Sequence, residues 1–342
     1  MTHSRRAARA AEGMDLAMMQ RARRVLSLTD HWRVVQEAFF GTRKARRRHA
    51  TNTAKATCAE AGLAAIAARW PGLASPETSA PIFILSAGWR SGSTFLQRWL
   101  MRNSDVLIWG EPYRYSEPIH RLARQVCAFA QPDWPPDFFF ADHYDQRSDF
   151  SEEFVANLYP SMQEFLGAHL AYFRSLFIEP TARFNRGRWG LKEVALTTDD
   201  ACYLKWLFPR ARFLFLYRSP YQAYRSYRQW RNWYRRWPDE PIFTPASFGR
   251  CWKELAADFV QNHGKVGGLL LPYEQLRTEE TRKRLEDYLE LTLADPYTLP
   301  RTRDRFQRDV QGEDDRWVPR LEQYLLKRAV EPVGTALGYR HP

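Results

Sequence analysis

The stretch PIFILSAGWRSGSTFLQRW, residues 81–99, decides the fold of this chain. Its first seven residues, 81–87, form a short apolar run that is typical of a buried strand. Glycines and small hydroxyl residues follow, and residues 93–103 then have the spacing of a helix. A strand, a glycine-rich turn and a helix in this order indicate an anion site, because the first turn of a helix presents unpaired N–H groups and partial positive charge.

Short apolar runs and helical patterns alternate outward from this stretch. Strands alternating with helices favour an α/β fold, so we predict a P-loop NTPase-like parallel sheet flanked by helices. Residues 115–180 are mostly helical by pattern and are interrupted by a proline- and aromatic-rich loop at 130–146, which is either packed surface or a lid over an acceptor pocket. The other predicted strands are 105–109, 188–194, 211–217 and one within 266–276, and the other predicted helices are 57–70, 196–208, 220–230, 278–291 (with Thr278 as N-cap) and 321–339.

The positive charge of the chain is concentrated near its start. The net charge of the 342 residues is +12, and residues 1–50 hold twelve Lys and Arg against four Asp and Glu. We predict that residues 1–78 form a basic, helical N-terminal extension ending in a Pro/Ser linker, and that 79–342 form the main domain. The arm is either a solvated tail or a weak contact for an anionic membrane or nucleic acid.

Cysteine usage and hydropathy predict the compartment. The four cysteines include no C-x-x-C pair, so we expect neither a disulfide framework nor a zinc site. We also expect that the protein lies in a reducing compartment. No apolar stretch reaches 18 residues, and no apolar segment follows the basic N-terminus. We therefore predict a cytoplasmic protein, peripheral at the membrane at most.

The turn differs from the Walker loop of ATP-binding proteins. Gly92 is followed by Ser93 and Thr94, so the Walker lysine position is Ser93, and the first Walker glycine position is Ala87. No strand end offers an obvious magnesium-binding Asp. A kinase needs the lysine and Mg²⁺ because the γ-phosphoryl group is highly charged. A sulfuryl group carries one negative charge fewer. It can therefore be transferred without a metal, with hydrogen bonds and one or two cations to stabilise it.

The segment GWRSGSTFLQRW (88–99) resembles the 5′-phosphosulfate loop of sulfotransferases that use 3′-phosphoadenosine 5′-phosphosulfate (PAPS). Its R-S-G-[ST]-[ST] form is similar to the carbohydrate and tyrosylprotein branch. The resemblance implies that Arg90, Ser91, Gly92, Ser93 and Thr94 hold the phosphosulfate, and that Arg90 also stabilises the transferring group.

Two further segments resemble the nucleotide-binding motifs of the same family. FLFLYRSPYQAYRSYRQW (213–230) matches the 3′-phosphate motif through Arg218 at a strand end and Ser226 eight residues later on a helix. Eight residues span about two helical turns, but the first few lie in the turn, so both side chains can converge on one phosphate. LLLPYEQL (269–276) is similar to the family's last strand and implies that Tyr273 lies near the nucleotide; the alternative is a purely structural motif.

Two strand ends carry the implied catalytic groups. LIWGEPYRY (107–115) resembles the family segment with a glutamate after the second strand, which implies Glu111 as general base; a capping or ion-paired Glu is the alternative. GLKEVAL (190–196) resembles the third active-site strand, which implies that Lys192 stabilises charge on the bridging oxygen as the S–O bond breaks. A buried pair of Lys192 with Glu193 is the alternative there.

The resemblance covers residues 81–291 and, more weakly, 321–339, and it departs from the family in two places. No motif marks the basic loop that closes over the nucleotide in many members, and we predict residues 298–317 as its counterpart, with Arg301, Arg303 or Arg305 as the candidate. No histidine has the spacing of the catalytic base of the cytosolic branch. His120 and His143 are the only substitutes we consider, and we interpret both as ordinary surface residues.

The sequence thus predicts an enzyme that moves a sulfuryl group from PAPS to an acceptor hydroxyl without a metal. A cytosolic location together with such motifs suggests a bacterial source, and we therefore favour a saccharide, glycolipid or small-metabolite acceptor over a protein tyrosine. The aromatic and arginine-rich run QWRNWYRRW (229–237) either contacts that acceptor or packs in the core. The alternatives are a small-molecule kinase on a P-loop fold and a non-catalytic binding scaffold.

Overall fold

The computed structural model describes residues 58–102, 104–111, 118–131, 140–141, 144, 149–152, 156, 158–228, 244–299 and 318–340. The predictions for the basic arm, for His143, for the run 229–237 and for Arg301, Arg303 and Arg305 lie outside these residues.

A parallel sheet of five strands forms the centre of the described chain. Its strand order is β2-β3-β1-β4-β5, and every neighbouring pair is parallel, which confirms the predicted α/β class. Because β1 lies in the middle, the glycine-rich turn after it lies between the carboxyl ends of β3 and β4. The strands are β1 (Ile82–Ser86), β2 (Val106–Trp109), β3 (Arg188–Glu193), β4 (Arg212–Tyr217) and β5 (Leu269–Pro272).

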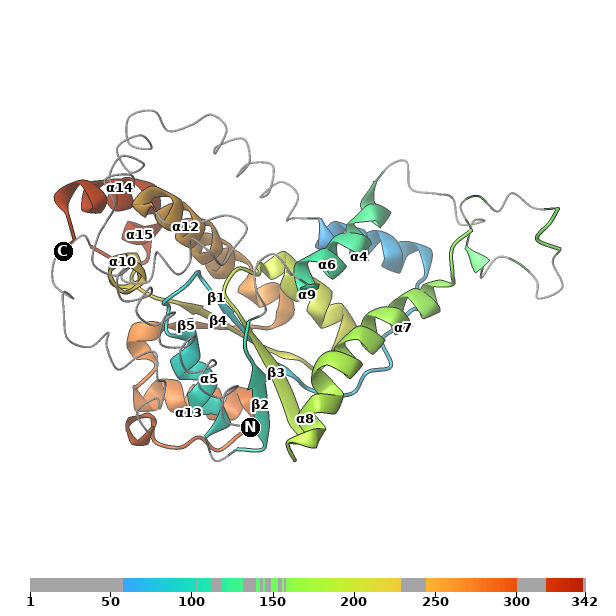
Figure 1. The fold of residues 1–342 in the computed structure, drawn as a ribbon, viewed down its shortest axis with the longest axis horizontal. Coiled ribbons are helices and arrows are strands. Elements are labelled where there is room, and N and C mark those ends of the chain that lie inside the picture. The colour runs from blue at the N-terminus through green and yellow to red at the C-terminus, as the bar shows by residue number, and fades with distance from the viewer. Residues whose placement is uncertain are drawn as a thin grey trace, which may run out of the picture.

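Alternate residues of each strand pack into different cores on the two faces of the sheet. Ile82 and Ile84 of β1 join α5 (Ser93–Met101) and α13 (Glu279–Leu289) on one face. Phe83 and Leu85 join the other core, which α7 (Met162–Phe173), α9 (Thr198–Leu207) and α12 (Pro245–Asn262) cover. Figure 1 shows these two helical layers on opposite sides of the strands.

The remaining elements lie around this sandwich of helices and sheet. They are α4 (Ala59–Arg69), α6 (Pro118–Cys127), η1 (Ala128–Ala130), η4 (Arg174–Ile178), α8 (Glu179–Arg183), α10 (Pro220–Arg228), η5 (His263–Val266), η6 (Tyr273–Gln275), η7 (Pro296–Thr298), α14 (Arg320–Val330) and α15 (Val333–Ala336).

Local sequence signals explain several helix starts. The Thr197 hydroxyl accepts from the Asp200 N–H and the Asp200 carboxylate accepts from the Thr197 N–H, a capping box that begins α9. The predicted N-cap Thr278 is confirmed, because its hydroxyl accepts from the N–H of Thr281. The eighteen-residue α12, which no sequence pattern had singled out, begins with a capping box at Thr244.

Two predicted elements have different bounds in the structure. The last strand was predicted within 266–276, but β5 covers only Leu269–Pro272, because η5 precedes it and Gly267 adopts a left-handed φ of 65°. The predicted closing helix 321–339 is two helices, α14 and α15. Pro332, which has no N–H to donate, stands between them.

The expectation of no disulfide is wrong, because Cys58 and Cys127 form one. They are 69 residues apart, and no spacing rule reveals such a pair. Disulfides persist mainly in oxidising compartments, so the cysteines no longer support a reducing one. No helix in the described residues is both long enough and apolar enough to cross a membrane.

Helix α4 lies on the N-terminal side of the predicted domain boundary between residues 78 and 79. It packs against α6 and α9 as well as being tied to α6 by the disulfide. The boundary itself stays a prediction.

Candidate active site

The turn after β1 is held in an unusual backbone conformation. Gly88, Arg90 and Gly92 have φ values of 78°, 63° and 91°, all in the left-handed region. For a non-glycine residue such as Arg90 this conformation costs on the order of 1 to 3 kcal/mol and persists only where the surroundings fix it. The Ser91 hydroxyl fixes it from within, since it is buried and donates to the carbonyl of Gly88 at 2.7 Å.

Helix α5 begins directly after this turn. Its N-cap is Gly92, which offers no side-chain cap. The N–H groups of the first turn therefore have no partner within the helix, and they carry the positive end of the helix dipole. Ser93 is buried and Thr94 is exposed. The first turn of α5 thus offers backbone donors, the Ser91 hydroxyl is used by the turn itself, and the anion site stays a prediction.

Gly92, Tyr273 and Arg218 form a stack across β1 and β4. A Cβ atom at Gly92 would lie 2.2 Å from Cδ2 and Cε2 of Tyr273, so the ring rests directly on the glycine. Arg218 contacts the same ring, with its Cζ 4.4 Å from the ring centroid. Only glycine at position 92 leaves room for Tyr273 beneath the guanidinium.

Arg90 joins Arg218 and Ser226, the two predicted 3′-phosphate residues. Its Nε donates to the Ser226 hydroxyl at 2.9 Å, and its carbonyl accepts from Arg218 Nη1 at 3.3 Å. Arg218 also donates to Gln222 Oε1 at 3.2 Å through Nη2. The turn after β1, the end of β4 and the last turn of α10 therefore meet around Arg90. That Arg218 and Ser226 bind one phosphate stays a prediction.

Two residues that the sequence analysis did not assign hold the start of this motif. The Trp252 indole on α12 donates to the carbonyl of Arg218 at 2.9 Å. The carboxylate of Glu274 accepts from the N–H of Ser219 and from the Tyr339 hydroxyl, each at 2.9 Å. Glu274 follows Tyr273 in the quoted segment LLLPYEQL, so the motif carried the signal, but only the fold shows what its carboxylate contacts.

The second part of the candidate site is an ion pair between Glu111 and Lys192. Lys192 Nζ lies 2.8 Å from Glu111 Oε2, although the angles of the contact fall outside hydrogen-bond geometry. The Lys192 side chain is 7% exposed and that of Glu111 is 33% exposed, so the lysine is enclosed while part of the glutamate side chain faces solvent. The Oε2 atom of Glu111, which faces the lysine, is buried. The alternative of a Lys192–Glu193 pair is not what the structure shows.

Glu193 occupies the opposite face of β3 from Lys192. Its register partner on β1 is Leu85, whereas the partner of Lys192 is Ile84, and these two belong to different cores. Burial, followed by the negative charge of Glu111, raises the pKa of the Glu193 carboxyl well above its usual range. Burial therefore favours the neutral form of Glu193, and Glu111 is the carboxylate that lies beside Lys192.

The sequence analysis interpreted His120 as an ordinary surface residue, and this interpretation is wrong. Its side chain is 17% exposed, and Nδ1 lies 3.0 Å from Oδ1 of the buried Asp200. The contact joins α6 to the start of α9. The histidine thus has an acidic partner on a neighbouring element, which its sequence position could not reveal.

The described site residues form two groups at the carboxyl edge of the sheet. Arg90, Gly92, Arg218, Ser226 and Tyr273 are connected by contacts around β1 and β4, and Glu111 with Lys192 lies at the ends of β2 and β3. Ligands of open parallel sheets bind along this edge. Cations and helix N–H groups for an anion thus stand beside a carboxylate able to accept a proton.

Comparison with known proteins gave one family model and several solved structures. The model described as "Sulfotransferase family" matches residues 81–295. A sulfotransferase domain of the Synechococcus olefin synthase is 18% identical and aligns over 78% of this chain and 98% of its own length, with a TM-score of 0.38. No curated protein matches the sequence.

Two further solved structures gave similar values. A Mycobacterium avium sulfotransferase is 16% identical, with 86% of this chain and 85% of its own covered and a TM-score of 0.36. An Alicyclobacillus acidocaldarius sulfotransferase is 15% identical, with 77% and 98% covered and a TM-score of 0.36.

Proposed function

The chain belongs to the sulfotransferase family, and from this premise we propose that it transfers the sulfuryl group of PAPS to an acceptor hydroxyl, with Glu111 as general base. The observation that carries the proposal is the 2.8 Å pair of Glu111 and Lys192 at the sheet edge that also holds the turn after β1. A base and a cation side by side at the end of two strands suit a reaction in which a hydroxyl loses a proton while a leaving oxygen gains charge.

On the nucleotide side, the N–H groups of Ser93 and Thr94 with the Arg90 guanidinium would hold the 5′-phosphosulfate. Arg218 and Ser226 would hold the 3′-phosphate, and Tyr273 would keep Arg218 in place through the ring contact at 4.4 Å. Binding a dianion there replaces the contacts that these cations now make with Ser226, Gln222 and a backbone carbonyl. Charge-assisted hydrogen bonds to phosphate are stronger than such neutral contacts.

On the acceptor side, Glu111 would take the proton of the hydroxyl as its oxygen attacks sulfur. Lys192, freed from the carboxylate as the carboxylate becomes neutral, would stabilise the charge that develops on the bridging oxygen. Catalysis would come mainly from positioning and electrostatics, and no metal would be required. Membership of the family supports PAPS as the co-substrate. The acceptor that we favour is a saccharide, glycolipid or small-metabolite hydroxyl.

The turn after β1 lacks the phosphate-binding lysine that the kinase alternative requires. The position of the phosphate-binding lysine is Ser93, whose side chain is buried at the start of α5. The scaffold alternative does not account for a partly exposed Glu111 paired with an enclosed lysine at the carboxyl edge of the sheet.

We predict that the full chain releases 3′-phosphoadenosine 5′-phosphate (PAP) from PAPS in the presence of a suitable hydroxyl compound. The measurement is PAP release by chromatography with panels of sugars, glycolipids, aliphatic alcohols and phenols. Excess EDTA should leave the rate unchanged. A chain that consumes ATP–Mg²⁺ with the same panel and ignores PAPS would contradict the proposal in favour of a kinase.

A further inference from the structure

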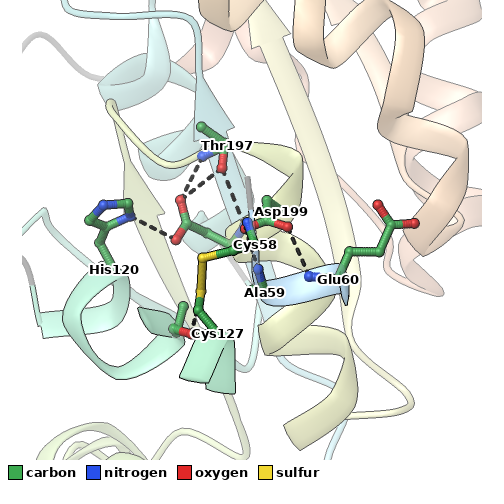
Figure 2. The surroundings of a disulfide bond; sticks show 9 residues. Cys58, Ala59, Glu60, His120, Cys127, Thr197 and Asp199 are labelled. Carbon is green, nitrogen blue, oxygen red and sulfur yellow. Dashed lines mark hydrogen bonds and ion pairs between the residues drawn. A yellow bond between two sulfur atoms is a disulfide. The ribbon is translucent and has the colours of Figure 1, made fainter. Parts of the chain in front are cut away.

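Glu111 and Lys192 are carried by strands that are held in different ways. Lys192 belongs to β3, which has a parallel strand on each side. Helix α9 follows β3, and Asp199 in its first turn accepts from the N–H groups of Ala59 and Glu60 at 2.8 and 2.9 Å. Figure 2 shows this carboxylate facing the start of α4. The strand of the lysine is therefore fixed on both sides, and the helix that follows it is fixed as well.

Glu111 follows an edge strand instead. In the sheet that the structure describes, β2 has only β3 as a neighbour (Figure 1). The register ends with Trp109 opposite Leu191, and the exposed Gly110 separates that pair from Glu111. The place of the carboxylate beside Lys192 therefore depends on how firmly the last residues of β2 are held.

The carbonyl of Ile108 is held by a side chain of α5, on one face of the sheet. Gln97 Nε2 donates to this carbonyl at 2.7 Å, and the Ile108 side chain packs in the same core as α5. Gln97 lies about one helical turn after Ser93, the first residue of the helix. This side chain thus joins the helix that begins at the proposed phosphosulfate turn to the strand that leads to the base.

The next residue, Trp109, is held on the other face by the π-helical turn η4. Its indole Nε1 donates to the Thr181 hydroxyl at 2.9 Å and to the carbonyl of Phe177 at 3.2 Å. The same carbonyl accepts from the Thr181 hydroxyl at 2.7 Å, and both partners are buried. Such π-helical turns are rare and occur frequently at functional sites. Consecutive residues of β2 are therefore fixed from opposite faces of the sheet, directly before Gly110 and Glu111.

We propose that Gln97 and Trp109 are positioning residues of the transfer reaction, which set the place of Glu111 beside Lys192. This rests on the proposed function, in which Glu111 is the base. Both side chains act through the backbone of residues 108–110 rather than on the reacting atoms. Gln97 in addition links the nucleotide side to the acceptor side, because it belongs to the helix whose first N–H groups face the phosphosulfate. A misplacement of about 1 Å can lower a rate by about 10²-fold.

The experiment is a double-mutant cycle with the base. Gln97→Met removes the amide donor and keeps the length of the side chain. Trp109→Phe removes the indole N–H and keeps an aromatic ring in the packing. Each substitution is made in the wild type and in Glu111→Gln. Initial rates of PAP release from PAPS, with an acceptor found in the panel, measure turnover, and a titration with PAP measures nucleotide affinity.

The matched control is Gln323→Met. Gln323 Nε2 donates to the carbonyl of Val318 at 2.7 Å, so the variant loses the same kind of contact on α14, which packs against α12. We expect Gln323→Met and Gln97→Met to lower the melting temperature by similar amounts. Turnover of Gln323→Met should stay within about twofold of the wild type.

We expect Gln97→Met and Trp109→Phe each to lower turnover by about tenfold or more, while the Kd for PAP changes by less than about threefold. In Glu111→Gln, either substitution should lower the remaining turnover by less than about twofold, because a base that is absent cannot be misplaced. Hydrogen exchange by mass spectrometry should show the amides of residues 106–111 exchanging about tenfold faster in Gln97→Met.

Equal fold losses with and without the Glu111 carboxylate would overturn the proposal, since Gln97 and Trp109 would then support the fold rather than the base. Unchanged turnover in both single variants would overturn it as well. A chain that releases no PAP from PAPS with any acceptor would reject the proposed function. The exchange of residues 106–111 is measured without turnover, so an unchanged rate there would reject the anchoring of β2 independently.

Discussion

Glu111→Gln should lower turnover of PAPS with acceptor by about 10² to 10⁴-fold, the range that general acid–base catalysis contributes. The amide keeps the size of the side chain and an oxygen facing Lys192 Nζ, 2.8 Å away in the wild type, but it cannot take the acceptor proton. PAP affinity should stay within about threefold, since a group used only in the transition state contributes little to ground-state binding. Initial rates of PAP release and a PAP titration measure the two effects separately.

The neighbouring carboxyl provides the control for this variant. Burial raises the pKa of Glu193 well above its usual range and so favours the neutral form of the carboxyl, which Glu193→Gln matches in size and charge. We expect it to change turnover by less than about threefold. Equal losses in both variants would contradict the assignment of Glu111, because a general disturbance of the sheet edge would then explain them.

Gly92→Ala should weaken PAP binding by about 10- to 100-fold, which corresponds to the usual 1 to 3 kcal/mol of backbone strain together with a displaced side chain. The φ of 91° already disfavours any side chain at this position. The new Cβ would also lie 2.2 Å from the Tyr273 ring, so the ring must leave the Arg218 guanidinium that it supports. Calorimetric titration with PAP measures the loss.

The variant Gly88→Ala separates the effect of backbone strain from the effect of displacing the Tyr273 ring. Gly88 has a φ of 78° in the same turn, but a Cβ there meets nothing within 4 Å. The Gly88→Ala variant should therefore lose PAP affinity through backbone strain alone, by about tenfold or less. A larger loss in Gly88→Ala than in Gly92→Ala would contradict the role of the Tyr273 contact.

The sheet could be predicted because each of its strands carries a dense local signal. A buried parallel strand is a short apolar run between turn residues, and β1 to β4 fit that description within two residues of their observed ends. The last strand is weaker in pattern, since glycines precede it, and its bounds were therefore predicted too widely. Helix α12 was missed because its buried residues are interspersed with polar ones and its start depends on a capping box at Thr244.

The site could be predicted where its residues fall in contiguous motifs. Arg90, Arg218 and Ser226 were each proposed from such segments, and in the structure the Arg90 side chain contacts Ser226 while its backbone carbonyl contacts Arg218. Their roles in binding stay predictions. Contacts between residues far apart in the sequence leave no contiguous motif from which they could be predicted. The Cys58–Cys127 bond, the pairing of His120 with Asp200 and the choice of Glu111 rather than Glu193 as the partner of Lys192 all depend on how the helices and strands pack.

The most direct test of the proposed function is a thermal-shift titration with PAP beside 5′-AMP and ATP–Mg²⁺, in the wild type and in Arg218→Ala. Ligand at about 100 times its Kd should add about 2.7 kcal/mol to the free energy of unfolding. We predict stabilisation by PAP, little by 5′-AMP, and loss of the difference in Arg218→Ala, because Arg218 binds the 3′-phosphate that only PAP carries. Stabilisation by ATP–Mg²⁺ alone, or by none of the three nucleotides, would contradict sulfuryl transfer from PAPS at this site.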